Sequence, residues 1–451
     1  MTTNTAPTFN LGTGKVQYAL GVADSRVASV IQQADGQLVV AGYSHSATDV
    51  DFGLLRLSLF NGALDTGFGV GGKLLVSAGP GDDFGQCALR QADGKLVMAG
   101  WSTASNGSPS DFSLVRLLPD GTLDPSFGNA GKLVLPVGNA VDSAYSLIQQ
   151  SDGKLVVAGT SGNGSTYFDF SLIRLLPDGT LDTSFDGDGK LLIPMASEFD
   201  YVRSVIQQPD GKLVLVGTSD NGHYANDFRV TRLLADGGLD TGFGTGGSVI
   251  LPAGSGVGQS ATGIVLADGK LLVAGSCQNG ATYDFTLIRL RADGSLDTTF
   301  DADGKLMIPV GVGADFCTDV IQTSDGKLVL AGYSFNGVNN EVSLVRLHAD
   351  GSLDTSFDGD GKLTIDVSPG NDQAYSLIQQ DNGKLVVAGN NSAQGDVTLI
   401  RLNADGSLDT TFGDAVGGGS VNTLGGSVAY TENASPVLID TSVVLIDPEL
   451  S

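Results

Sequence analysis

Short apolar runs separated by polar turns follow one another along nearly the whole chain. One representative stretch contains four of them, at 144–150 (AYSLIQQ), 154–160 (KLVVAGT), 170–176 (FSLIRLL) and 190–195 (KLLIPM). Runs of this length bounded by turn signals are typical of strands, and few stretches show the period of an amphipathic helix. An Asp-Gly turn between the first two runs favours an antiparallel hairpin. The pattern therefore predicts an all-β protein.

The same group of four runs occurs seven times. An Asp-Gly or Asn-Gly pair marks the first hairpin of each copy, at spacings of 57 to 59 residues. The first members of these pairs are Asp35, Asp93, Asp152, Asp210, Asp268, Asp325 and Asn382. One four-stranded sheet cannot bury both of its faces alone, whereas sheets stacked in a closed ring can. We therefore predict a seven-bladed β-propeller with four antiparallel strands per blade.

The repeated sequence resembles a known family. The run SDGKLVVAG (151–159), followed by DFSLIRLLPDGTLDTSF (169–185), is similar to the delta-60 repeat, which builds a bacterial β-propeller family of unknown function. The resemblance extends over residues 9–426. It implies the propeller fold and leaves the activity open.

The end of the chain departs from the repeat. The segment GSVAYTENASPVLIDTSVVLID (426–447) resembles the opening of the cadherin-like modules of large bacterial surface and secreted proteins. We expect an N-terminal extension at 1–13, the propeller at 14–426, and a linker or the start of a truncated cadherin-like module at 427–451. The resemblance implies an extracellular or cell-surface location within a larger chain, with the propeller itself a monomer. The N-terminus lacks the basic and apolar regions of a secretory signal.

The order of strands within a blade follows from their composition. Runs such as LVVAG are apolar on both sides, which suits an interior strand, whereas the run KLLIPM contains Pro, which belongs at an edge. We place SVIQQ innermost, KLVVAG second, FSLIRL third and KLLIPM outermost, an order that resembles NHL-type propellers. Two segments, 14–21 and 418–426, compete for the outermost position of the seventh blade. We predict that the N-terminal segment closes the ring.

Composition narrows the classes of partner. The 451 residues contain 24 Lys and Arg against 50 Asp and Glu, a net charge of −26. Nucleic acid and anionic membranes are poor partners for such a chain, because binding them relies on basic residues. No apolar run is long enough to insert into a membrane. Three cysteines, Cys87, Cys277 and Cys317, are too few for a disulfide framework, and we expect them to be small buried hydrophobes.

An Arg, an Asp and a Phe recur at fixed spacing in all seven copies, as at Arg174, Asp182 and Phe185. We interpret them as structural, because a loop built identically in every blade is more plausibly scaffold than seven equivalent ligand sites. The adjacent DGDG string, with Asp186 and Asp188, resembles a calcium loop. Its acids are kept at Asp301, Asp303, Asp358 and Asp360, but three other copies replace them with uncharged residues. The loop therefore closes without a metal.

A second group of acids precedes the innermost strand in five blades. These residues are Asp83, Asp142, Asp200, Asp315 and Asp372. One interpretation is a broken ring of carboxylates at the channel mouth that binds a divalent cation, most plausibly Ca²⁺. The alternative, which we weigh more heavily, is that each Asp caps the turn leading into the strand through backbone amides.

The loops between the second and third strands differ most in length and content. Variable loops on a uniform scaffold are where binding usually occurs. Four aromatic residues in or beside them are candidates for stacking on a ligand: Trp101, Tyr167, Tyr224 and Tyr283. We expect a surface glycan or a protein ligand on this face.

Catalytic patterns are scarce. The three histidines, His45, His223 and His348, are too scattered for a triad, and no zinc-binding string of His or Cys occurs. The sequence thus favours a non-catalytic binding or scaffolding propeller of a bacterial cell-surface or secreted multidomain protein, with calcium as a conceivable aid. The alternative is a polysaccharide hydrolase or lyase that uses Asp pairs at the channel mouth.

Overall fold

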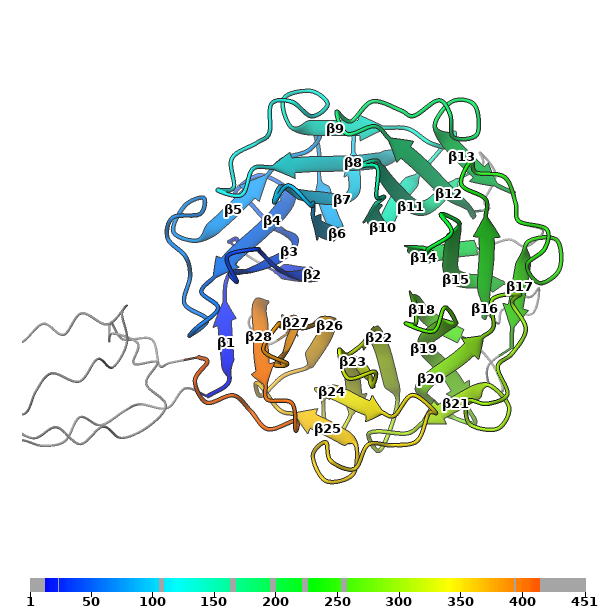
Figure 1. Ribbon diagram of the computed structural model, residues 1–451. Coiled ribbons are helices and arrows are strands. Elements are labelled where there is room, and N and C mark those ends of the chain that lie inside the picture. The colour runs from blue at the N-terminus through cyan, green and yellow to red at the C-terminus, as the bar shows by residue number, and fades with distance from the viewer. Residues whose placement is uncertain are drawn as a thin grey trace, which may run out of the picture. The chain divides into compact units, whose positions relative to one another are not determined.

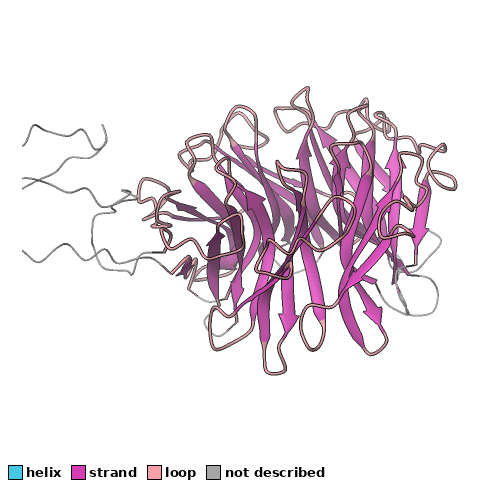
Figure 2. Ribbon diagram, turned by 60° about the horizontal axis from the view of Figure 1, so that its bottom comes forward, coloured by secondary structure: helices cyan, strands magenta, loops and turns pink. Residues whose placement is uncertain are grey.

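The computed structural model describes residues 13–22, 24–104, 109–162, 168–194, 200–220, 226–252, 258–392 and 395–413. These residues form seven four-stranded antiparallel sheets arranged around a central opening (Figure 1). The strands run across the thickness of the ring, and the loops lie on its two faces (Figure 2). The predicted all-β, seven-bladed propeller is confirmed.

The first six blades place their strands in sequence order from the opening outwards, as predicted, and the seventh does so for its first three strands. The inner strands are β2 (Ser25–Gln32), β6 (Asp83–Arg90), β10 (Asp142–Gln149), β14 (Asp200–Gln207), β18 (Gly258–Val265), β22 (Asp315–Gln322) and β26 (Asp372–Gln379). The second strands are β3 (Leu38–His45), β7 (Leu96–Thr103), β11 (Leu155–Gly162), β15 (Leu213–Asp220), β19 (Leu271–Asn279), β23 (Leu328–Phe335) and β27 (Leu385–Asn391).

The third strands are β4 (Val50–Leu57), β8 (Ser110–Leu117), β12 (Phe168–Leu175), β16 (Asn226–Leu233), β20 (Thr282–Leu290), β24 (Asn340–Leu347) and β28 (Asp396–Leu402). The outer strands have only four residues each: β5 (Lys73–Val76), β9 (Lys132–Leu135), β13 (Lys190–Ile193), β17 (Ser248–Leu251), β21 (Lys305–Ile308), β25 (Lys362–Ile365) and, in the seventh blade, β1 (Lys15–Tyr18).

The ring is closed by its N-terminal strand. β1 pairs antiparallel with β28, from Lys15 opposite Ile400 to Tyr18 opposite Val397. The prediction that the N-terminal segment completes the seventh blade is confirmed, while the competing segment 418–426 lies outside the described residues. Closure removes the exposed edge that β28 would otherwise offer for aggregation.

The core lies between neighbouring blades. Second and third strands are buried along almost their whole length, and each apolar cluster combines residues from two successive blades. Seven Phe side chains, one per blade, are among the largest side chains that are fully buried. They are Phe68, Phe127, Phe185, Phe243, Phe300, Phe357 and Phe412. Burying each of them contributes about 2 kcal/mol.

Each of these rings packs against a glycine of the next blade. A Cβ added to Gly237, whose φ is +101°, would lie 3.1 Å from the ring of Phe185. At the closing joint a Cβ on Gly62 would meet Phe412 of the last blade at 2.7 Å. The Asp-Gly turn after the third strand therefore needs Gly for its left-handed backbone and for the close approach of the neighbouring Phe.

Two further points complete the fold. The described residues contain no helix, and so none that is long and apolar enough to cross a membrane. Cys277 and Cys317 are buried and Cys87 is half-buried. Burial raises the pKa of the Cys87 thiol to about 12, which keeps it an unreactive neutral thiol.

Candidate functional site

The recurrent Arg, Asp and Phe form one compact corner in each blade. Arg174 Nε donates to Asp182 Oδ2 at 2.7 Å, and the guanidinium lies 4.7 Å from the ring centroid of Phe185. Arg174 Nη1 also donates to the carbonyl oxygen of Ala235, in the next blade, at 2.5 Å. These are the contacts that a structural role requires, since they join successive blades.

The carboxylate of this corner is held ionised. Burial opposes ionisation, but hydrogen bonds from Ser184, Lys154 and Arg174 outweigh it and hold the pKa of the Asp182 carboxyl well below its usual range. The same kind of contact joins the seventh blade to the first, because Arg401 donates to the carbonyl oxygens of Leu59 and Phe60.

The DGDG string is a turn that is held by hydrogen bonds within the protein. Asp186 has a φ of +48°, and in the second blade Gly128 has a φ of +50° at the same place. Asp tolerates this left-handed conformation better than most residues. The carboxylate of Asp188 accepts a hydrogen bond from the backbone N–H of Lys190 at 2.8 Å. A metal is not needed to close the loop.

The five acids that precede the inner strands are buried within turns rather than exposed to the channel. Asp142 is fully buried, and its two carboxylate oxygens accept hydrogen bonds from the backbone N–H groups of Val137 at 2.7 Å and Gly138 at 3.0 Å. Burial raises the pKa of the Asp142 carboxyl. This is the turn-capping arrangement that we weighed against a cation site.

The other four acids are also buried. Asp83, Asp315 and Asp372 each accept bonds from two successive backbone N–H groups, and Asp200 accepts one from the hydroxyl of Ser219. Within the described ranges no three His, Cys, Asp or Glu side chains are grouped as metal ligands. Calcium binding here stays a prediction, and a cation would have to displace N–H donors to reach these oxygens.

A β-bulge interrupts every inner strand. In β10 the pairing with β11 passes from Ala144 directly to Ser146 and leaves Tyr145 out of the ladder. A bulge re-aims the residue that it leaves unpaired. Since the inner strands border the opening (Figure 1), these residues lie along its wall. Outside the fifth blade they are Ala28, Gln86, Tyr145, Arg203, Thr318 and Tyr375.

Aromatic side chains near these bulges contact one another from blade to blade. Ring centroids lie 5.1 Å apart for Tyr43 and Phe84, 5.4 Å for Phe84 and Trp101, and 5.6 Å for Trp101 and Tyr145. This arc spans three blades. We call it, together with the second arc described next, the aromatic belt.

The second arc of the aromatic belt lies in the fifth, sixth and seventh blades. Ring centroids are 5.3 Å apart for Tyr283 and Phe316, and 5.1 Å apart for Phe316 and Tyr333. Tyr375 of the seventh blade completes the arc, because it lies close enough to Tyr333 to affect its pKa. Burial raises the pKa of Tyr333 to about 12, so its hydroxyl is neutral at physiological pH. All the rings of the belt are half-buried.

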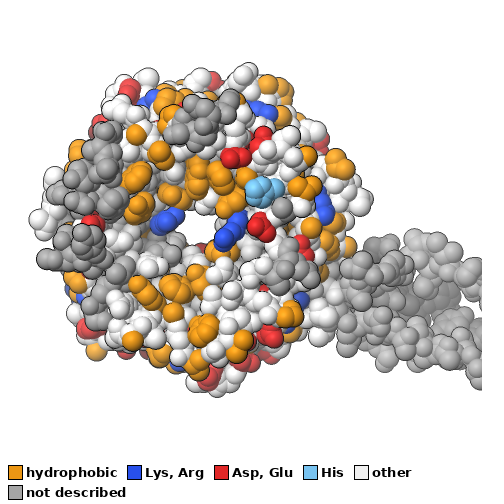
Figure 3. Space-filling model, turned by 180° about the vertical axis from the view of Figure 1, so that it is seen from behind, with side chains coloured by type: hydrophobic (Ala, Val, Ile, Leu, Met, Phe, Trp, Pro, Cys, Tyr) orange, Lys and Arg blue, Asp and Glu red, His pale blue; other side chains and the backbone are white. Residues whose placement is uncertain are grey.

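Two exposed arginines adjoin the belt. The guanidinium of Arg203 lies 4.2 Å from the ring centroid of Tyr145, and Arg26 Nη1 donates to the hydroxyl of Tyr375 at 3.1 Å. Tyr375 in turn donates to Gln373 Oε1 at 2.7 Å. Basic side chains stand at the edge of the opening on the face where the inner strands begin, with hydrophobic and acidic side chains beside them (Figure 3). We call this edge the channel mouth.

Two of the four aromatic residues expected to bind a ligand belong to the belt. Trp101 and Tyr283 lie in its first and second arcs, whereas Tyr167 and Tyr224 lie outside the described residues. Sequence reasoning missed the other belt residues, because they lie on inner and second strands rather than in variable loops. Aligning the seven copies gives a signal: the second and fourth positions of the inner strand range from small to large, aromatic or basic residues, whereas the third position is always small.

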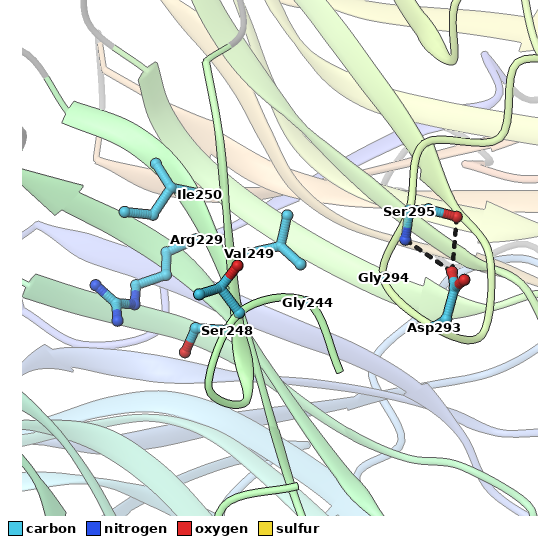
Figure 4. Close-up of a pocket in the computed structure, with 9 residues that line it drawn as sticks. Arg229, Gly244, Ser248, Val249, Ile250, Asp293, Gly294 and Ser295 are labelled. Carbon is cyan, nitrogen blue, oxygen red and sulfur yellow. Dashed lines mark hydrogen bonds between the residues drawn. The ribbon is translucent and has the colours of Figure 1, made fainter. Parts of the chain in front are cut away.

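Shallow grooves also occur at the outer rim. One, of about 630 Å³, lies between β17 and the turn Asp293–Ser295 of the next blade (Figure 4). In this view Arg229 points away from that turn, whose Asp293 carboxylate accepts two hydrogen bonds from Ser295. A groove of about 670 Å³ has the equivalent position between the first two blades. The rim grooves therefore arise from the way in which successive repeats pack.

Comparison with known proteins agrees with the fold. A search of curated proteins found no match. Among solved structures the chain is similar to a streptogramin B lyase (12% identity, TM-score 0.51, covering 86% of this chain and 97% of that one). It is also similar to a virginiamycin B lyase from Staphylococcus aureus (12%, 0.51, 86% and 99%) and to an ulvan lyase of a polysaccharide lyase family (11%, 0.51, 87% and 97%). At such identities the likeness shows the fold alone.

The sequence itself matches a family description in every blade. The family is described as a domain of unknown function (DUF5122) beta-propeller, and the matched segments are 33–68, 91–127, 150–185, 208–243, 266–300, 323–357 and 380–412. Together they cover more than half of the chain. The chain therefore belongs to the DUF5122 β-propeller family.

Proposed function

We propose that this chain is a non-catalytic binding propeller that holds a carbohydrate against the aromatic belt at the channel mouth. The observation that supports this most is the run of ring contacts from Tyr43 to Tyr145 across three blades. Ligand sites are commonly lined by aromatic side chains with a few polar groups that fix orientation. Half-buried rings with fixed neighbours lose little further freedom when a sugar stacks on them.

The fold does not require aromatic residues at these positions. The second position of the inner strand is Phe84 in the second blade but Ser143 in the third and Gln373 in the seventh, and the blade forms in each case. Aromatic rings that folding leaves optional, yet that contact one another around an opening, support a binding role.

The setting that we propose is a bacterial cell-surface or secreted multidomain protein. The resemblance of 426–447 to cadherin-like modules supports it, although that segment lies outside the described residues. The net charge of −26 suits a soluble surface exposed to solvent.

The proposal is tested by fluorescence. Trp101 belongs to the belt and is the only Trp in the chain, so its emission reports on this site alone. Titration with a panel of neutral and acidic oligosaccharides should give a saturable change for at least one of them. The variant Tyr145→Ala should lose it, whereas Phe60→Ala, which removes an exposed ring elsewhere, should keep it. No response across the panel, or an unchanged response in Tyr145→Ala, would contradict the proposal.

The same mixtures separate binding from catalysis. A binding propeller leaves the bound oligosaccharide intact, so the number of reducing ends should stay constant over hours. Release of new ends that depends on an Asp at the channel mouth would replace this proposal with the polysaccharide hydrolase or lyase that the sequence left as the alternative.

A further inference from the structure

We propose that the ligand of the channel mouth is an acidic oligosaccharide, whose carboxylate or sulfate groups are bound by Arg26 and Arg203. The inference rests on the proposed function and adds the ligand's charge and the two residues that recognise it.

The first argument is that these two arginines lack the partners that the repeat arginines have. All seven repeat arginines pair with a corner Asp, as Arg174 does with Asp182 at 2.7 Å. Over the described part of the chain, neither Arg26 nor Arg203 has an acidic group within ion-pair distance, and both side chains are exposed. In a protein with a net charge of −26, acidic partners are abundant, so two unpaired cations at one opening need another explanation.

The second argument is the geometry of their donors. The Cζ atom of Arg203 lies 4.2 Å from the centroid of the Tyr145 ring, and its guanidinium makes no hydrogen bond to the described residues, so its N–H groups are available to a ligand. Arg26 uses Nη1 for the hydroxyl of Tyr375, and its side chain makes no other hydrogen bond to the described residues. A guanidinium edge fits a carboxylate or sulfate through two parallel hydrogen bonds.

The third argument is that aromatic packing prepares these donors for binding. A guanidinium held against a ring has already lost much of its rotamer freedom. Binding a ligand therefore costs less side-chain entropy at this arginine. The tyrosines nearby add no negative charge: burial raises the pKa of Tyr375, Tyr43 and Tyr201, so all three hydroxyls are neutral at physiological pH. The belt thus combines neutral rings for sugar faces with cations for sugar acids.

The spacing of the two arginines favours an oligomer over a single sugar. Arg26 lies in the first blade and Arg203 in the fourth, three blades apart, which is the largest separation that seven blades in a ring permit. Aromatic rings of the first arc lie between them. A chain with several charged units could contact both arginines and stack on the rings between them.

Matched pairs of ligands test the charge. Trp101 fluorescence would be titrated with oligogalacturonate and its fully methyl-esterified form, and with sulfated and unsulfated dextran oligosaccharides of equal length. We expect at least one charged member to bind at least tenfold more tightly than its neutral counterpart. Its affinity should fall as salt rises, because exposed charges are screened at a range of about 8 Å in physiological salt.

Matched variants test the residues. Arg203→Gln and Arg26→Gln should each weaken binding of the charged ligand about tenfold and leave the melting temperature unchanged. Arg90→Gln should do neither, because Arg90 is at the opposite end of an inner strand.

The outcomes are distinct. Equal binding of charged and neutral sugars, unaffected by the arginine variants, overturns this inference and leaves the proposed function standing. Binding of polyglutamate but of no saccharide overturns the saccharide class. No response to any sugar overturns the proposed function itself.

Discussion

Two parts of each blade follow opposite rules. At the corner, the same Arg, Asp and Phe make the same contacts in all seven blades, with the Arg guanidinium 4.5 to 4.8 Å from the Phe ring. At the channel mouth, the bulge residue changes from Ala28 to Tyr145 to Arg203. The corner makes the same contact between successive blades seven times, so its residues are the same in every blade. The residues at the channel mouth make no such repeated contact and can differ. Identity across the repeats marks the scaffold, and difference marks the candidate site.

The largest effect that we expect comes from opening the ring. Deleting residues 1–18 removes β1, exposes the edge of β28 and uncovers the apolar cluster that Val16 and Tyr18 pack against. The loss should be on the order of 4 kcal/mol or more, since it combines strand hydrogen bonds with apolar burial. Urea unfolding measures it, and Gln17→Ala, an exposed position of the same strand, serves as the control. An unchanged midpoint would show that the ring does not depend on β1.

Breaking one corner should cost less but still be large. Arg174→Ala leaves the buried Asp182 without its closest cation and removes the bond to the next blade. Removing one partner of a buried pair typically costs 3 kcal/mol or more, and the remaining contact with Lys154 limits the loss here to about 3 kcal/mol. Thermal and urea unfolding measure the change. A loss below about 1 kcal/mol would contradict the scaffold role of the corner.

The pH dependence of stability should have two limbs of opposite sign. The pKa of the Asp182 carboxyl is lowered in the folded protein, so its contribution is complete above pH 4 and is lost as the pH falls further. Asp319 of β22 has the reverse shift, since burial raises its pKa to about 7. The folded state therefore binds more protons than the unfolded one between pH 4 and 7, and stability declines as the pH rises through that range.

A single substitution isolates the second limb. Ser146 and Ser376 hold the position of Asp319 in other blades, and the hydroxyl oxygen of each accepts a backbone N–H from the next blade, as Asp319 does from Leu377. Asp319→Ser should therefore keep this contact between blades and flatten the decline of melting temperature between pH 4 and 7. A decline that persists in this variant would show that another group causes it.

The smallest effect concerns calcium. Because the oxygens of Asp142 already accept backbone N–H groups, millimolar Ca²⁺ should leave the melting temperature within about 1 °C. A calcium-dependent rise that disappears in Asp142→Ala would instead support the cation site that the sequence suggested.

The fold could be read from the sequence because its rules act over short distances. Each hairpin is specified by its own turn. A strand assignment that is ambiguous in one copy becomes clear when the same pattern occurs in seven copies. The closing strand was predictable for a related reason, since an orphan run before the first repeat, at 14–21, fits the one outer position left empty.

The channel mouth could not be read in the same way. The contact of Trp101 with Tyr145 joins two blades across 44 positions of sequence and depends on a bulge that turns Tyr145 out of the ladder. Sequence spacing shows neither the bulge nor the neighbour. The sequence also left two interpretations of the acids open: Asp142 stands where an inner strand begins, and only the structure shows that the backbone N–H groups of Val137 and Gly138 bind its carboxylate.

The most direct test of the central claim compares one arginine from each region in the same two assays. We predict that Arg174→Gln lowers the melting temperature but leaves the affinity of the folded protein for oligogalacturonate unchanged, as followed by Trp101 fluorescence. Arg203→Gln should do the reverse, with an unchanged melting temperature and an affinity about tenfold weaker. If both variants lose stability, or if neither changes the affinity, the division between a uniform scaffold and a variable binding mouth is contradicted.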